Sequence, residues 1–191
     1  MIVREARPAG FDAVARLTVA AYREDRQLEG ETGYDELLAD VASRAETGTL
    51  LVAADEQTSR ILGAVTFVLP GSPYAQVAAP DEAEFRMLAV DPTVQGAGVG
   101  EALVRACLQR AAEHGCTAVT ICTRDFAAAA QRLYARLGFQ RVPELDWSPM
   151  PGVDLLALRY TLTPPAELTP AELTPAAPEP PAARLPGAGR R

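Results

Sequence analysis

The chain lacks clustered basic residues and long apolar runs, and each absence excludes a class of protein. Its 191 residues include 18 lysines and arginines against 25 acidic residues, for a formal net charge of −7. Nucleic acids are bound by clustered cations, so we expect no nucleic-acid partner. No apolar run approaches the roughly 20 residues that a bilayer-spanning helix needs, so we expect no membrane partner.

Cysteine is also scarce. Cys107, Cys116 and Cys122 form an odd set without the spacing of a disulfide framework or a metal site, so we expect reduced thiols and no metal. The first residues, Met1 to Glu5, carry charge where the apolar core of a signal peptide would begin. These features predict a cytoplasmic protein. The sequence is compatible with a monomer or a homodimer and does not choose between them.

The composition changes near Thr163. Beyond this point proline recurs every few residues, and the segment Ala166–Pro170 is repeated as Ala171–Pro175. Proline interrupts helices and sheets, and the segment has too few large apolar residues to form a core. We therefore predict a folded domain over residues 1–162 and a disordered or extended tail over 163–191.

The first 162 residues alternate between strand and helix patterns. Strands are expected at Ile2–Arg7, Thr49–Ala54, Ile61–Leu69, Glu84–Val90, Ala118–Thr123, Gln140–Trp147 and Leu155–Leu162. Helices are expected at Phe11–Arg23, Tyr34–Thr47, Val99–His114 and Ala127–Leu137. The early hairpin favours antiparallel pairing, and the later strand–helix–strand unit favours a parallel step. The order predicts an α/β (α+β) domain with a mixed sheet.

A glycine-rich turn, Gln95 to Gly100, joins an expected strand to an expected helix. Its three glycines allow a tight turn with exposed N–H groups, and the helix adds the positive end of its dipole, so we expect a phosphate-bearing ligand. A P-loop would continue with Lys-Ser/Thr, but Glu101 follows. The spacing is one residue too tight for a dinucleotide fingerprint, although Asp125 follows the next strand. A purely structural turn is the remaining alternative.

Two blocks of the sequence resemble the GNAT superfamily of N-acetyltransferases. The turn fits the family pattern Arg/Gln-x-x-Gly-x-Gly/Ala, and the preceding Glu84–Pro92 resembles the family's fourth strand. Downstream, Ala130–Phe139 is similar to the family block Ala-x-x-Leu-Tyr-x-x-x-Gly-Phe. The resemblance implies a mostly antiparallel sheet of six to seven strands with helices on both faces. It also implies acetyl-CoA as the co-substrate.

The resemblance further implies where acetyl-CoA binds. The candidate residues lie on the fourth strand, in the turn and at the following helix: Leu88, Ala89, Val90, Gln95, Gly96, Ala97, Gly98, Val99, Gly100, Glu101, Ala127 and Ala130. Two of them depart from the common pattern. Ala127 stands where many members have an asparagine that holds the pantetheine arm, and Ala97 stands where a lysine or arginine is common. We therefore expect the pyrophosphate to be held mainly by backbone N–H groups.

Acetyl transfer to an amine needs a neutral amine, a stabilised carbonyl oxygen and a proton for the departing thiolate. The resemblance implies direct attack, so no cysteine nucleophile is required. We predict Tyr134 as the general acid, because a phenol is protonated at neutral pH; an aromatic packed in the core is the alternative. Amides of Leu88 to Val90 are candidates to polarise the carbonyl. Glu84 is the candidate base, acting through water, and a solvated carboxylate at a strand end is its alternative.

The sequence contains fewer signals for the residues that bind the acceptor than for those that bind acetyl-CoA. The loop between the first two expected helices carries Glu24, Asp25, Glu29 and Glu31, with Tyr22 and Tyr34 at its ends. Acidic and aromatic groups together favour a small cationic amine, although a charged loop can simply be solvated. The predicted function is acetyl transfer from acetyl-CoA to a primary amine of a small molecule or a protein. The alternatives are a non-catalytic acyl-CoA-binding module with this fold and a nucleotide-binding oxidoreductase fragment.

Overall fold

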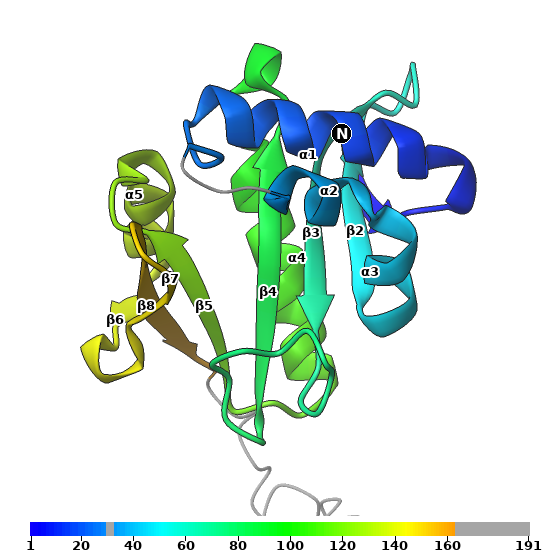
Figure 1. Cartoon of the computed structure of the whole chain (residues 1–191). Helices are drawn as coiled ribbons and strands as arrows, with labels where there is room; N and C mark the ends of the chain where they lie inside the picture. The colour runs from blue at the N-terminus through cyan, green and yellow to red at the C-terminus, as the bar shows by residue number, and fades with distance from the viewer. Residues whose placement is uncertain (30–32, 163–191) are drawn as a thin grey trace, which may run out of the picture.

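A single mixed sheet forms the centre of the molecule (Figure 1), in a computed structural model that describes residues 1–29 and 33–162. Its strands are β1 (Ile2–Glu5), β2 (Thr49–Ala54), β3 (Ile61–Val68), β4 (Glu82–Val90), β5 (Ala118–Arg124), β6 (Gln140–Arg141), β7 (Trp147–Met150) and β8 (Val153–Thr161). The order is β1-β2-β3-β4-β5-β8-β6, and β7 also pairs with β8. Every pairing is antiparallel except that of β4 with β5. The predicted mixed, mostly antiparallel sheet is confirmed, with eight strands.

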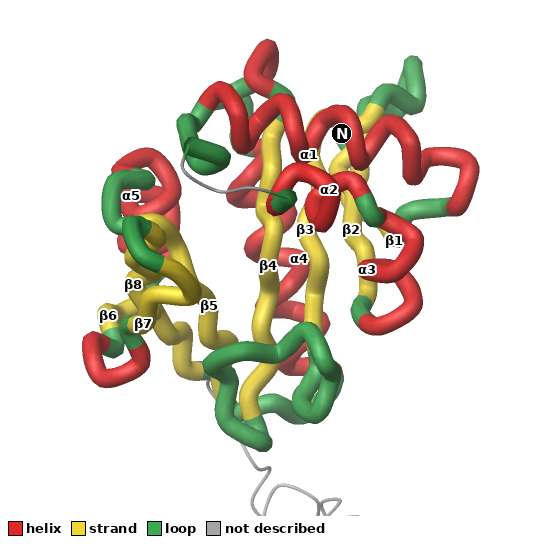
Figure 2. Tube along the Cα trace, in the orientation of Figure 1, coloured by secondary structure: helices red, strands yellow, loops and turns green. Residues whose placement is uncertain are grey.

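Helices cover both faces of the sheet, as predicted (Figure 2). They are α1 (Phe11–Glu24), α2 (Tyr34–Ala39), α3 (Val41–Thr47), α4 (Val99–Glu113) and α5 (Ala128–Leu137). In Figure 1, α1 to α3 lie in front of the sheet and α4 lies behind it. The alternation of side chains along β2 separates two cores: Leu50 and Val52 pack with Val14 of α1, whereas Leu51 and Ala53 join the core that contains α4.

One glycine sets how closely α4 approaches the sheet. A Cβ at Gly63 of β3 would lie 2.8 Å from Val99 Cγ1 and 2.9 Å from the carbonyl oxygen of Ala89. A side chain here would push the start of α4 away from β3 and β4. Gly63 therefore helps to place the turn that precedes this helix. Within residues 1–29 and 33–162, no helix is long and apolar enough to cross a membrane.

Two predicted elements are wrong in their continuity. The expected helix Tyr34–Thr47 is two helices, because Asp40 leaves the helical conformation and caps the second, accepting the Ser43 N–H at 3.2 Å. The expected strand Gln140–Trp147 is interrupted by a short 3-10 turn that begins at Pro143, a residue without the N–H that a strand ladder needs. The predicted tail over 163–191 lies outside the described residues.

Candidate active site

The strands β4 and β5 part shortly after they meet. They pair only over Glu82–Glu84 and Ala118–Thr120. Further along β4, Met87 has a positive φ of 54°, and Met87 and Leu88 together stand opposite Val65 of β3. This is a β-bulge with a non-glycine residue in the left-handed region, a strained conformation that concentrates at functional sites. Beyond Glu84, the β5-facing backbone groups of β4 have no strand partner in the described chain, so a ligand can use them.

The glycine-rich turn lies between the end of β4 and the start of α4. Gly96 and Gly98 both have φ of +80°, where other residues are strained, and a Cβ on either would meet open space. Gly100 serves packing instead: a Cβ there would lie 3.3 Å from Leu133 Cδ2 and 3.5 Å from Val90 Cγ2. The first two glycines shape the turn, and the third lets α4 lie close to α5.

The N–H groups at this turn are available to a ligand. Those of Gly96 and of residues 98–101 have no acceptor among the described residues, whereas the Ala102 N–H already bonds the Gly98 carbonyl at 3.0 Å. Such a row at a helix N-terminus is a binding site for an anion. Ala97 adds no charge, so the turn fits a pyrophosphate held by main-chain donors, and the parted strands fit the extended arm that a coenzyme A molecule carries.

Charged side chains beside the turn pair with one another. The carboxylate of Glu101 accepts hydrogen bonds from Arg136 Nη2 of α5 at 2.9 Å and from Arg105 Nη2 at 2.8 Å. These bonds, that from Arg136 first, hold the pKa of Glu101 below its ordinary value. The predicted contribution of Glu101 to coenzyme binding therefore falls to its N–H group. No sequence pattern indicates that Arg136 reaches α4.

Tyr134 lies at the centre of an aromatic cluster. Its ring packs on Phe85 and Phe139, with centroid distances of 5.9 and 5.5 Å, and the residue is 5% exposed. Burial raises the pKa of Tyr134 above the ordinary value of a phenol. No described residue forms a hydrogen bond with its hydroxyl. The ring is thus a core aromatic, as the alternative reading held, while the hydroxyl remains protonated and free to donate.

Glu84 is not the solvated strand-end carboxylate of the alternative reading, because the residue is only 1% exposed. Its Oε2 accepts the N–H groups of Gln76, Val77 and Ala78 at 2.9, 3.1 and 3.4 Å. Its Oε1 lies 3.7 Å from Arg86 Nε. The carboxylate therefore fastens a loop to β4, and only Oε1 remains to take part in proton transfer.

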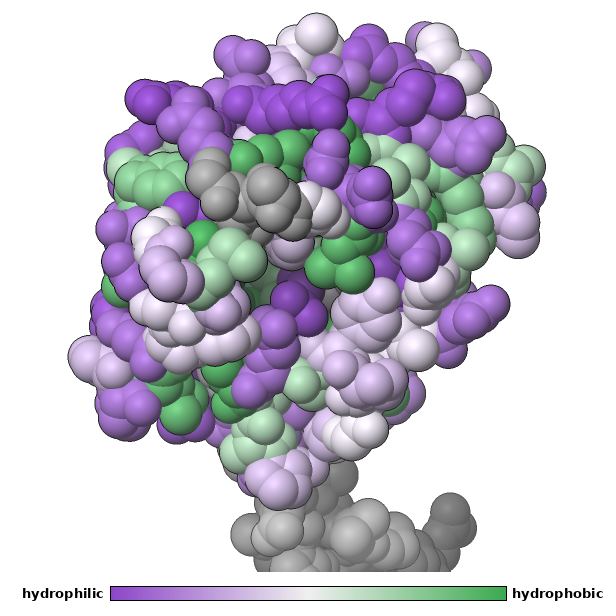
Figure 3. All heavy atoms as spheres, in the orientation of Figure 1, coloured by the Kyte–Doolittle hydropathy of each residue, from purple (hydrophilic) through white to green (hydrophobic). Residues whose placement is uncertain are grey.

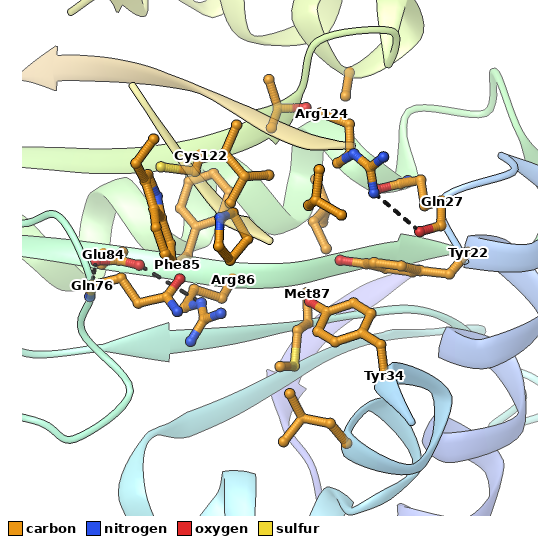
Figure 4. Close-up of a pocket in the computed structure, with 18 of the residues that line it drawn as sticks. Tyr22, Gln27, Tyr34, Gln76, Glu84, Phe85, Arg86, Met87, Cys122 and Arg124 are labelled. Atoms are coloured by element: carbon orange, nitrogen blue, oxygen red, sulfur yellow. Dashed lines mark hydrogen bonds and ion pairs between the residues drawn. The ribbon is translucent and has the colours of Figure 1, made fainter. Parts of the chain in front are cut away.

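Tyr134, Glu84 and the bulge line one cavity of about 240 Å³ between the parted strands (Figure 4). The wall is completed by the end of α1, α2, β5, β7, β8 and Ala130 of α5. Figure 3 shows a hollow on this face, with hydrophobic and hydrophilic surface side by side at its rim. In the described residues, no group of three or more His, Cys, Asp or Glu side chains could hold a metal ion.

The described acidic residues of the loop after α1 are not part of this lining. Gln27, Tyr22 and Tyr34 line the cavity, whereas Glu24, Asp25 and Glu29 do not. Glu29 pairs with Arg26 at 2.8 Å on the exposed surface, and Glu31 lies outside the described residues. The charged side chains that do line the cavity are Glu84, Arg86 and Arg124. The sequence analysis missed both arginines, because Arg86 lies on β4 and Arg124 on β5, and they share a wall only in the folded chain.

Ala127 stands at the start of α5 and offers no polar side chain there. Gln131, one turn later, donates its amide to the carbonyl oxygens of Arg124 and Asp125 at 3.1 and 2.7 Å, and so closes the β5–α5 turn. Cys122 lines the cavity, where burial raises the pKa of its thiol to about 11. A thiol in this state is a poor nucleophile at neutral pH, which agrees with direct attack.

Comparison with known proteins decides the family. The model of the acetyltransferase (GNAT) family matches residues 11–139. The chain belongs to the GNAT family. This result excludes the oxidoreductase alternative, and acetyl-CoA is the co-substrate of the family's acetyltransferases. The bulged β4, the unpaired N–H groups of the turn and the opening between β4 and β5 fit that molecule.

Individual GNAT relatives add detail. The chain is 36% identical to mycothiol acetyltransferase from Kocuria rhizophila over 95 residues. This match covers 49% of this chain and 30% of that protein. The chain therefore spans about a third of that relative's length. A GNAT acetyltransferase from Staphylococcus aureus Mu50 aligns with a TM-score of 0.67 at 13% identity, over 85% of this chain and 99% of its own. A Brucella melitensis GNAT acetyltransferase solved in complex with acetyl-CoA aligns with a TM-score of 0.58 at 21% identity, over 85% and 88%.

Proposed function

We propose that this protein transfers the acetyl group of acetyl-CoA to a primary amine of a small molecule by direct attack. The observation that supports this most is the common cavity: the bulge of β4, Tyr134 and Glu84 line one space. A cavity of about 240 Å³ suits a small acceptor. The predicted roles of Tyr134 as general acid and Glu84 as base stay proposals.

Acetyl-CoA supplies the activated thioester. N–H groups of β4 that face the opening, among Leu88 to Val90, polarise the acetyl carbonyl as negative charge develops on its oxygen. The amine nitrogen forms the new C–N bond while the C–S bond breaks. The Tyr134 hydroxyl donates a proton to the departing thiolate, and Oε1 of Glu84 accepts the proton of the amine through water.

An acceptor screen tests the proposed function. The full chain is incubated with acetyl-CoA and a panel of amines, and free thiol and acetylated product are measured together. We expect amine-dependent thiol release with one acetyl group added per thiol. Tight binding of acetyl-CoA by calorimetry without turnover of any amine would instead identify a non-catalytic acyl-CoA-binding module.

A further inference from the structure

In the part of the chain that the structure describes, arginines outnumber carboxylates among the residues that line the cavity. The chain has a formal net charge of −7. The described residues that line the cavity include two arginines, Arg86 and Arg124, and one carboxylate, Glu84. Tyr22, Tyr134 and Cys122, which also line the cavity, are uncharged at neutral pH, because burial raises their pKa values. The charges of the described lining therefore favour an anionic group.

Arg86 has an unused hydrogen-bond donor in this cavity. Its Nη1 donates to the carbonyl oxygen of Tyr74 at 3.0 Å, and its Nε lies 3.7 Å from Glu84 Oε1 (Figure 4). Its Nη2 has no partner among the described residues. The side chain is 17% exposed, so water satisfies it only in part. A guanidinium in this state gains from an anionic partner.

Glu84 leaves hydrogen-bond donors of Arg86 unused. Its Oε2 is already solvated by the three N–H groups of residues 76–78, and its contact with Arg86 is long. Arg44 of α3 is fully buried, donates to Leu38 O at 2.8 Å and forms no hydrogen bond with a carboxylate of the described residues. Its charge adds to the positive field on the acceptor side.

Arg124 is placed differently from Arg86. Its guanidinium donates to the carbonyl oxygens of Gln27 and Gly152 and lies 4.7 Å from the centre of the Phe126 ring. It holds the α1 end and the β7–β8 turn against β5, and it contributes charge to the wall. Arg86 is therefore the residue suited to contact an anion directly.

Given the proposed acetyl transfer, on which this inference rests, we propose that the acceptor is a small amine that also carries a carboxylate, as an amino acid does. Arg86 binds that carboxylate and so orients the amine. Leu37, Met87 and Leu155 provide apolar wall for the body of the molecule. This acceptor differs from the cationic amine that the acidic loop favoured in the sequence.

Matched acceptors test the proposal on the wild-type chain. Phenylalanine, phenylalaninamide and 2-phenylethylamine share a ring and an amine but differ in the carboxylate, and methionine with its amide and decarboxylated amine forms a second set. Assays near about pH 9 reduce the differences in amine protonation. We expect kcat/KM for each amino acid to exceed that of its partners by about 10-fold or more. Equal or higher kcat/KM for the partners would overturn the proposal.

Variants at position 86 separate substrate binding from support of Glu84. We expect Arg86→Gln to raise KM for the amino acids about 10- to 100-fold, to leave KM for the decarboxylated amines nearly unchanged, and to be partly rescued by Arg86→Lys. The exposed Arg16→Gln on α1 is the control. An equal loss of kcat for both substrate types would show that Arg86 serves only Glu84.

Two further readouts keep the outcomes distinct. Acetyl-CoA affinity and thermal unfolding report whether each variant folds. If Arg86→Gln does not fold, Arg86→Lys and the wild-type substrate sets test the proposal instead. Turnover of amines without a preference for carboxylates contradicts this inference alone. An absence of turnover on every amine contradicts the proposed function itself.

Discussion

The two sides of the opening between β4 and β5 are built in different ways. The proposed coenzyme side is made of main-chain N–H groups, those of Gly96 and of residues 98–101. The acceptor side is made of side chains from α1, α2, β4, β5, β7 and β8. A site made of main chain can be recognised from a short motif, whereas a pocket made of distant side chains exists only once the fold has assembled. If this is correct, coenzyme binding depends on main-chain groups and acceptor binding depends on side chains.

The largest effect is expected at Tyr134, which lies where the two sides meet. Tyr134→Phe keeps the ring packed on Phe85 and Phe139 but removes the hydroxyl, so we expect kcat to fall about 100-fold with little change in acetyl-CoA affinity. Tyr160→Phe, in the same aromatic cluster but outside the cavity lining, is the matched control. Steady-state kinetics and calorimetry measure both quantities.

The pH profile sharpens this test. Because burial raises the pKa of Tyr134, its phenol stays protonated through neutral pH, and the wild-type rate should not decline with rising pH until above about pH 10. A decline near neutral pH, or an unchanged kcat in Tyr134→Phe, would leave Tyr134 as a packing residue only.

A smaller effect is expected at Glu84. Glu84→Gln keeps an oxygen that can accept the loop N–H groups but removes the base, so we expect kcat to fall about 10-fold at neutral pH. The deficit should shrink at high pH, where the amine loses its proton without help. Glu82→Gln on the same strand removes an ion pair with Arg159, at 2.9 Å, outside the cavity lining. It should lower stability without a pH-dependent loss of rate, and a similar profile for both variants would remove the base role from Glu84.

The coenzyme side is tested by its glycines. Gly98→Ala places a side chain at a φ of +80° in front of the free N–H groups, so we expect acetyl-CoA Kd to rise about 10-fold. Gly115→Ala, at a φ of +71° just beyond the other end of α4, imposes similar strain of about 1–2 kcal/mol away from the site. Both should lose stability, and only the first should lose affinity. Equal affinities would place the coenzyme elsewhere.

The smallest effect is expected from salt. Ala97 carries no charge, and Arg105 and Arg136 are already paired with Glu101, so we expect main-chain donors to hold acetyl-CoA. We expect its Kd to change less than about 3-fold between about 50 and about 500 mM salt. A steep loss of affinity in calorimetry would instead assign the coenzyme phosphates to those two arginines.

Much of the fold could be predicted because its signals are local. Alternation of apolar residues along β2 and β3 and the glycines around α4 specify strands, a turn and a helix within a few residues. The two errors also have local causes: the side chain of Asp40 caps a new helix, and Pro143 breaks a strand ladder. Weighing these two residues against the apolar pattern would have found both breaks.

The acceptor site could not be predicted in the same way. The acidic residues near Tyr22 stand together in the sequence, and this grouping favoured a cationic substrate. Those that the structure describes, Glu24, Asp25 and Glu29, do not line the cavity, whereas Arg86 and Arg124, 38 positions apart in the numbering, do. Gln131 is a similar case, because its amide closes the β5–α5 turn only when α5 is in place. The net charge of a local segment therefore says little about the charge of a pocket assembled from several elements.

The short seam between β4 and β5 also bears on how the fold is held together. Within the sheet, three residue pairs of β4 and β5 connect the half that contains β1 to β4 with the half that contains β5 to β8. A coenzyme lying in the opening would contact both halves where β4 and β5 no longer pair with each other. At a concentration of 100 times its Kd, a ligand bound only to the native state adds about 2.7 kcal/mol to the free energy of unfolding. The concentration of acetyl-CoA would then determine the stability of the folded chain as well as its rate of acetyl transfer.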